Sequence, residues 1–123
     1  MSTTPEPEFD WSQAASLLGD DPNVVDPDML SIVQELVDGA EVQFQELRSQ
    51  NPETDRKGIA SKAHALRGCL LNFGFTAVGG ILFQVEKEAY PASEFLGRID
   101  QAYAVFLASK KLLAARYPGL GLK

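Results

Sequence analysis

The stretch DPDMLSIVQELVDGAEVQFQELR, residues 26–48, carries the strongest structural signal in the chain. Asp26 followed by Pro27 is a helix start, because aspartate caps free backbone N–H groups and proline fits the first helical position. Apolar residues then recur at spacings of three and four, which places them on one face of a helix. They are Met29, Ile32, Val33, Leu36, Val37, Ala40, Phe44 and Leu47. The stretch therefore predicts a long amphipathic helix whose apolar face is covered by other helices.

Three further apolar seams with helical spacing follow toward the C-terminus. We predict that their helices start at residues 51–53, at Thr76 and at Ser93, because these residues are typical caps. Gly79 and Gly80 fall in the second of these three helices, where glycines often permit close approach of a neighbour. The three seams are Ile59, Ala63, Leu66, Leu70 and Phe73; Val78, Ile81, Leu82, Val85 and Ala89; and Phe95, Ile99, Ala102, Phe106 and Leu113.

A shorter helix is expected before the long one, with Asp10 as its cap and Gly19 at its end. No stretch alternates with period two, and the connections are short. These features predict an all-α fold: an antiparallel up-and-down four-helix bundle with a short additional N-terminal helix. We expect the bundle to span residues 10–117, between a flexible tail at residues 1–9 and a frayed tail at residues 118–123.

The chain has 123 residues, 45% of them hydrophobic and 23% charged, which is typical of one globular domain. Its formal net charge of −6 argues against nucleic acid or an anionic membrane surface as the main partner. No apolar run approaches the roughly 20 residues of a membrane span, and the acidic start is unlike a signal peptide. We therefore expect a cytoplasmic protein, and the methionine start favours a free-standing one.

The chain contains one cysteine and one histidine. The single cysteine, Cys69, excludes an intrachain disulfide and a multi-cysteine zinc site, and we expect it to be a small buried residue. The single histidine, His64, excludes histidine-cluster metal sites and any mechanism that needs two imidazoles. The sequence therefore predicts no metal site.

His64 lies on the second long helix, away from the apolar seam. At about 100° per residue it is roughly 140° from the centre of that seam, so its imidazole is expected to face solvent. The alternative is a histidine buried in the core with its polar atoms satisfied.

Small residues surround His64 on its exposed face, namely Ala60, Ser61 and Gly68. A second protein could therefore approach the imidazole closely, and we predict that these residues form a partner-docking surface. Gly68 could instead serve close packing against a neighbouring helix. Leu71 also projects partly outward, which favours a docking contact, with half-buried filler as the alternative.

Arg67 lies three positions after His64, where helical side chains are neighbours. A phosphorylated imidazole carries nearly two negative charges, and a guanidinium beside it can donate charge-assisted hydrogen bonds. We therefore predict that Arg67 stabilises a phosphoryl group on His64, whereas a lone surface arginine is usually only a solvated cation.

The run AHALRGCLLNFGF, residues 63–75, resembles the signature of histidine-containing phosphotransfer domains. That signature has a histidine, any residue, an apolar residue, Lys or Arg, and Gly, followed after a gap by an apolar residue and a second Gly. The run FGFT, residues 73–76, looks similar to the phosphoacceptor domain of chemotaxis histidine kinases. The residues that fill the places of the signature are His64, Leu66, Arg67, Gly68, Phe73 and Gly74.

The resemblance covers roughly residues 10–117 and implies that His64 takes and gives phosphoryl groups, usually with an aspartate on a receiver domain. It also implies that Glu86 hydrogen-bonds the imidazole; the alternative is a surface ion pair of Glu86 with Arg67 or Lys87. The implied partners are response-regulator receiver domains, a hybrid histidine kinase, or both. The sequence departs from the family where Arg67 replaces the commoner lysine, and where two residues larger than usual, Cys69 and Leu70, follow Gly68.

The chemistry of such a carrier needs little from this chain. A neutral imidazole has a nucleophilic lone pair and requires no activating base. The chain has no Gly-x-x-x-x-Gly-Lys-Ser/Thr loop for nucleotide and no kinase signature. We therefore expect a monomeric phosphoryl carrier, not an enzyme, without a cofactor of its own and with Mg²⁺ on the partner receiver domain.

Two other functions fit parts of the sequence. A helical interaction or dimerisation module without phosphoryl chemistry would make His64 incidental and Leu71 only a binding contact. A metal-dependent hydrolase in a helical bundle would need Glu-x-x-His pairs from two helices, but the one histidine is preceded at that spacing by Ser61.

Overall fold

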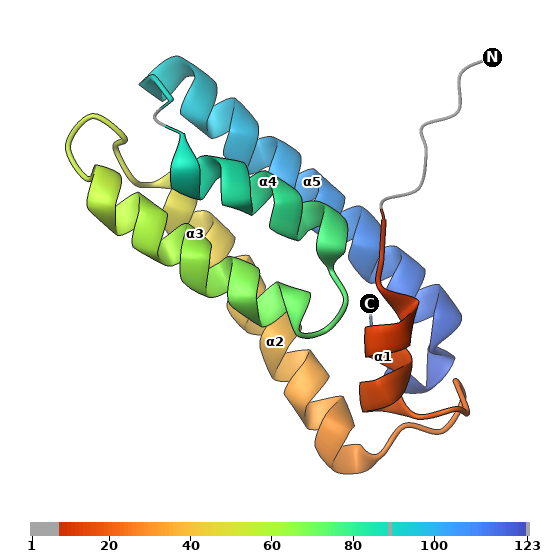
Figure 1. Cartoon of the computed structure of the whole chain (residues 1–123). Coiled ribbons are helices and arrows are strands. Elements are labelled where there is room, and N and C mark those ends of the chain that lie inside the picture. Colours follow the sequence, from red (N-terminus) through yellow and green to blue (C-terminus); the bar gives the residue numbers. More distant parts are fainter. Residues whose placement is uncertain (1–7, 89, 123) are drawn as a thin grey trace.

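The structure is a computed structural model that describes residues 8–88 and 90–122. These residues form helices and no strand (Figure 1). The elements are α1 (Trp11–Leu18), α2 (Pro27–Arg48), α3 (Arg56–Leu71), α4 (Thr76–Lys87), α5 (Ala92–Arg116) and a short 3₁₀ helix, η1 (Pro118–Leu120). The long helices α2 to α5 run up and down in an antiparallel bundle, and α1 is the short additional helix (Figure 1). The predicted all-α fold class is therefore confirmed.

The bundle follows chain order around its axis. Helix α3 packs between α2 and α4, and α5 closes the bundle against α4 and α2. The α3–α4 contact is the most extensive of these. Short connections make consecutive helices antiparallel neighbours. Side chains from α3 and α4 are therefore the pairs that meet most directly.

An aromatic cluster fills the middle of the core. The rings of Phe44 on α2 and Phe106 on α5 have centroids 5.4 Å apart, and Phe106 lies 5.6 Å from Phe75 in the α3–α4 connection. Phe9, just before α1, adds a ring 5.0 Å from Phe75. Aromatic pairs at such separations stabilise a core beyond the area that they bury. Phe75 thus packs the α3–α4 connection against α5 and against the segment before α1.

Most of the predicted seam residues are buried. Ile32 is an exception, because 47% of it is exposed. Four other seam residues are only half-buried, namely Met29, Leu36, Phe73 and Ile81. Phe73 lies beyond the end of α3 at Leu71, and Phe75 is fully buried instead. Ala89, which was predicted in the α4 seam, lies outside the described residues.

Two of the predicted helix starts are confirmed by their caps. The side chain of Asp10 accepts a hydrogen bond from the backbone N–H of Gln13 at 3.1 Å, and Asp26 accepts one from Asp28 at 2.9 Å. Gly19 ends α1 with a positive φ of 89°, a conformation that favours glycine.

The predicted start of α3 at residues 51–53 is wrong. The Asn51 side chain accepts from the N–H of Glu53 at 2.9 Å, and its carbonyl accepts from the N–H of Asp55 at 2.9 Å, so these residues form a turn. Asp55 is the cap instead and accepts from the N–H of Gly58 at 3.2 Å. An asparagine that satisfies a turn competes with its use as a helix cap.

The predicted caps of α4 and α5 are also wrong. Thr76 is the first residue inside α4 and makes no capping hydrogen bond, and the cap position belongs to Phe75. Helix α5 starts at Ala92 after Pro91, one residue before Ser93. Burial of Phe75 and the fixed φ of proline define these starts without a side-chain cap.

Both predicted tails need correction where the structure describes them. Leu120 in η1 is only 2% exposed, and the N–H of Gly119 donates to the carbonyl of Pro22 at 3.0 Å, so residues 118–122 pack on the bundle and are not frayed. At the other end Phe9 is 8% exposed, and the carbonyl of Glu8 accepts from the N–H of Ala77 at 3.2 Å. The remainder of the predicted N-terminal tail, residues 1–7, lies outside the described residues.

Among the described residues no helix combines the length and the apolar character that crossing a bilayer requires.

Gly74 in the α3–α4 connection should be intolerant of a side chain. Its φ is +93°, and an added Cβ would lie 2.7 Å from the backbone oxygen of Asp10. We expect Gly74→Ala to lower the free energy of unfolding by about 1–3 kcal/mol, measured by urea denaturation. The matched control is Gly80→Ala, because Gly80 lies within α4 and a Cβ there meets no atom within 4 Å. That change should raise stability by about 0.5–1 kcal/mol, and equal effects at both glycines would contradict this account.

Candidate functional site

The imidazole of His64 stands on the outside of the bundle. Its side chain is 66% exposed, whereas the α3 residues that face the core, Ile59, Ala63, Leu66 and Leu70, are fully buried. The predicted solvent-facing position is therefore confirmed, and the alternative of a core histidine is wrong.

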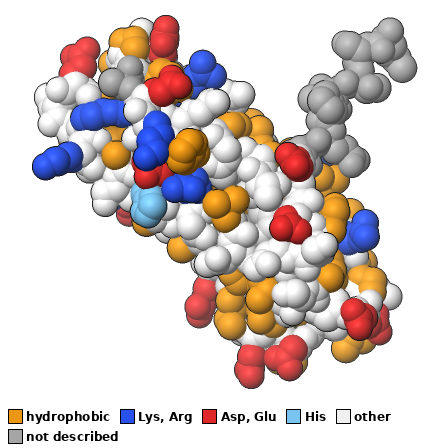
Figure 2. Space-filling view, viewed as in Figure 1, with side chains coloured by type: hydrophobic (Ala, Val, Ile, Leu, Met, Phe, Trp, Pro, Cys, Tyr) orange, Lys and Arg blue, Asp and Glu red, His pale blue; other side chains and the backbone are white. Residues whose placement is uncertain are grey.

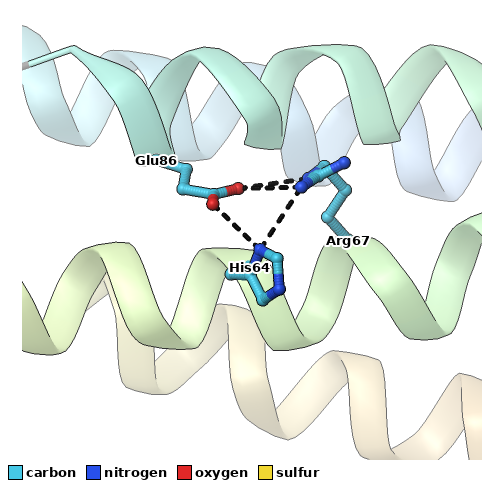
Figure 3. A network of polar contacts seen from close by, with 3 residues as sticks. All are labelled: His64, Arg67 and Glu86. Carbon is cyan, nitrogen blue, oxygen red and sulfur yellow. Dashed lines mark hydrogen bonds and ion pairs between the residues drawn. The ribbon is translucent and has the colours of Figure 1, made fainter.

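Glu86 on α4 reaches across to His64. The Nδ1 atom of His64 lies 2.9 Å from Oε1 of Glu86 (Figure 3). The Glu86 side chain is 15% exposed, because it emerges beside the buried Val85 at the α3–α4 boundary. One edge of the imidazole is thus held by a mostly buried carboxylate while the rest of the ring stays open.

Arg67 completes a three-residue network around the same carboxylate. Its Nε and Nη2 atoms lie 3.2 and 3.1 Å from Oε2 of Glu86, and Nη2 lies 3.3 Å from Nδ1 of His64 (Figure 3). Glu86 therefore contacts the imidazole and forms an ion pair with Arg67 at the same time. The two interpretations of Glu86 that the sequence left open occur together.

This network determines which nitrogen of the neutral ring is free. An ionised carboxylate only accepts hydrogen bonds, so Nδ1 carries the proton and donates it to Glu86. Nε2 then has the lone pair, and in Figure 3 it lies on the side of the ring away from Glu86 and Arg67. The arrangement presents a nucleophilic nitrogen to the outside.

Glu86 is suited to this task because it stays ionised. Burial raises the pKa of its carboxyl, but the hydrogen bond and charge of His64, together with the guanidinium of Arg67, outweigh burial and lower the pKa below the ordinary 4.5. At neutral pH the carboxylate therefore remains an acceptor for both neighbours.

The small residues around His64 leave its surroundings open. Gly68 is exposed, and a Cβ there would meet no atom within 4 Å. The alternative that Gly68 permits close packing against a neighbouring helix is therefore wrong. Ser61 is exposed and Ala60 is half-buried on the same helix. Their contact with a partner stays a prediction.

Leu71 is partly buried in the α3–α4 boundary. A Cβ added at Gly79 would lie 2.6 Å from its Cδ2 atom, so the leucine fills the space that this glycine leaves. The close approach that we predicted at Gly79 is confirmed, and Gly80 faces open space. Leu71 is therefore packing material in part, and its docking role stays a prediction.

Cys69 is exposed, so the prediction that it is buried is wrong. It follows Gly68 on the outer half of α3, where its neighbour Leu70 takes the core position. In the part of the chain that the structure describes, no group of three or more His, Cys, Asp or Glu side chains could hold a metal ion.

Two residues of the site were missed from the sequence. Phe83 on α4 is 45% exposed, and its ring centroid lies 5.0 Å from Cζ of Arg67. Arg56 at the start of α3 donates from Nη2 to the carbonyl of Val85 at 2.9 Å, which fixes the backbone next to Glu86. The one available signal was spacing, because Phe83 precedes Glu86 by three positions and so lies on the same side of α4.

Comparison with known proteins gave a family match. Searches of curated proteins and of solved structures found no match to the chain. A protein-family model described as "Hpt domain" matches residues 31–109. This segment contains the whole three-residue network and spans α3, α4 and most of α2 and α5. Because the match covers more than half of the 123 residues, the chain belongs to the Hpt domain family, the histidine phosphotransfer domains of phosphorelays.

Proposed function

We propose that this chain accepts a phosphoryl group on Nε2 of His64 and passes it to or from an aspartate on the receiver domain of a two-component phosphorelay. The observation that carries the proposal is an imidazole that is 66% exposed while its Nδ1 is held 2.9 Å from a mostly buried carboxylate. Membership of the Hpt domain family supports the same chemistry.

The transfer step uses the free lone pair of Nε2. It attacks the phosphorus of an aspartyl phosphate on the partner, the N–P bond forms, and the bond from phosphorus to the aspartate oxygen breaks with its electron pair leaving on the carboxylate. The imidazole ring gains positive charge in this step and keeps its proton on Nδ1, where the ionised Glu86 stabilises it. Transfer in the other direction reverses each event.

Arg67 acts first on Glu86 in this scheme. Its contacts to the carboxylate, at 3.1 and 3.2 Å, leave further N–H donors of the guanidinium unused by Glu86. We propose that these donors bind phosphoryl oxygens once His64 is loaded, which requires a small movement from the Nδ1 edge of the ring. Arg67 thus stabilises the phosphoryl group, as predicted from the sequence, only after His64 is loaded.

The charge around His64 fits an acidic partner. Residues 56–87, which form α3, α4 and their connection, contain five Lys or Arg and one Glu, a net charge of +4 in a chain of −6. Figure 2 shows Lys and Arg side chains gathered near the histidine, whereas Asp and Glu side chains dominate the far end of this face. Receiver domains supply the acidic residues and Mg²⁺ in the scheme proposed here, so this chain acts as carrier and not as enzyme.

The surface that meets the partner surrounds the imidazole. We propose that Ala60, Ser61, Gly68 and Leu71 contact the receiver domain, because three of them are small and leave the ring accessible. We propose that the chain acts in this role as a cytoplasmic monomer.

The first test is direct phosphorylation. Incubation with a phosphorylated receiver domain, or with phosphoramidate, should give acid-labile, alkali-stable phosphate on the wild type and none on His64→Gln. The variant should stay folded, because the His64 side chain is 66% exposed and glutamine can still donate to Glu86; thermal unfolding checks this. Absence of labelling of the folded wild type by either donor, or equal labelling of the variant, would favour an interaction module without phosphoryl chemistry.

The second test concerns charge. The rate of phosphoryl transfer from a receiver domain should fall as ionic strength rises. At 0.1 M salt, the attraction between exposed charges more than about 10 Å apart is largely screened. Lys57→Glu should slow transfer severalfold at low salt, since Lys57 is exposed and lies two turns from His64 on the same side of α3. Lys111→Glu is the matched control on α5 and should change the rate much less. Equal slowing by both variants would contradict steering by this face.

The third test concerns pH and Glu86. Because folding lowers the pKa of Glu86, its contribution to stability is present above the ordinary pKa of 4.5 and is lost as the pH falls through the lowered value. We expect the free energy of unfolding of the wild type to exceed that of Glu86→Gln by about 1–3 kcal/mol in urea at pH 6, with the difference shrinking as the pH is lowered below 4.5. A difference that is constant over this range would contradict ionic anchoring by Glu86.

A further inference from the structure

Phe83 is unlike the other phenylalanines of this chain. All seven lie in the described part, where five are buried and Phe73 is half-buried, whereas Phe83 is 45% exposed. The core of α4 is made by Val78, Leu82 and Val85 instead. Phe83 is therefore not explained by the packing of the bundle.

The ring of Phe83 lies against the guanidinium of Arg67. The distance from Cζ of Arg67 to the ring centroid is 5.0 Å, within the range of a cation–π contact. The Arg67 side chain is only 22% exposed, although it is charged and comes from the neighbouring helix. The ring thus shields a guanidinium whose N–H groups bind Glu86.

Lys87 contacts the same ring. Its Nζ lies 5.5 Å from the centroid, so two cations share one aromatic side chain beside the site. Lys87 follows Phe83 by four positions on α4, and residues at this spacing are neighbours on one face of a helix. Lys87 makes no ion pair with Glu86 among the described residues, which leaves the carboxylate to Arg67 and His64.

We propose that Phe83 is a positioning residue of the phosphoacceptor site. Its ring holds the Arg67 guanidinium against Oε2 of Glu86, and this fixes Oε1 opposite Nδ1 of His64. The proposal rests on the function proposed above. It concerns the tautomer of the His64 imidazole, which can be measured without any phosphoryl transfer. Without this support Arg67 can leave Oε2 and donate to Nδ1 from Nη2, which already lies 3.3 Å away, and the imidazole proton then moves to Nε2, the nitrogen that must stay free.

The experiment compares Phe83→Leu with Phe83→Tyr. Leucine keeps an apolar side chain but has no aromatic face, whereas tyrosine keeps the ring. Long-range ¹H–¹⁵N spectra report the tautomer of one residue only, because His64 is the single histidine. Leu96→Ala on α5 is the matched control, since Leu96 is also 45% exposed and is not part of the site.

We expect Phe83→Leu to shift the tautomer ratio toward the Nε2–H form by about two- to fivefold, the factor that a cation–π contact of ordinary strength supports. Phosphoramidate labelling of His64 should slow by a similar factor. Phe83→Tyr should restore both values, and Leu96→Ala should change neither.

An unchanged tautomer ratio in folded Phe83→Leu would overturn the proposal. Slower transfer from a receiver domain, with no change in the ratio, would also count against it, because the ring would then be a docking contact. A shifted ratio that Phe83→Tyr does not restore would contradict it too, because the aromatic face would not be the cause. A shifted ratio with tyrosine rescue supports it even if the wild type takes up no phosphate, a result that would remove the proposed function alone.

Discussion

Helices α3 and α4 can approach closely because Gly79 has no side chain at the point where Leu71 meets it. Every residue of the site depends on that approach. His64 and Arg67 belong to α3, whereas Glu86 and Phe83 belong to α4, and polar contacts of 2.9 to 3.2 Å between the two helices require a fixed distance between their axes. The hydrogen bond from Arg56 to the carbonyl of Val85 holds the same pair of helices at the other end of α4. The bundle therefore acts on the imidazole through one helix pair.

The site combines an open nucleophile with closed support. His64 is mostly exposed, but Arg67 and Glu86 behind it are 22% and 15% exposed; they form an ion pair with each other, and Glu86 accepts from the ring. Partial burial strengthens these contacts, because charged hydrogen bonds are screened less away from water. Nε2 is therefore open to solvent while the groups that orient the ring lie on its other side (Figure 3), and Gly68 places no side chain beside it.

Much of this arrangement could be predicted from the sequence, and the predictions that failed have physical reasons. Periodicity predicted the four long helices and the outward direction of His64, since both follow from angles within one helix. Asn51 was misassigned because its side chain satisfies a turn before Asp55 caps α3. Cys69 and Ile32 were expected in the core but face outward, which depends on how neighbouring helices cover each face. Phe83 was missed for the same reason, because its contact with Arg67 exists only once α3 and α4 are paired.

The positive charge of residues 56–87 would affect how a partner separates in the transfer that we propose. A phosphoryl group brings about 1.5 to 2 negative charges at neutral pH, so loading His64 would cancel nearly half of the local charge of +4. A partner that delivered the group would become less negative by the same amount. Long-range attraction between the two proteins would thus be stronger before the exchange than after it. A carrier of this kind would separate from its donor because of the reaction itself, without a moving part in the bundle.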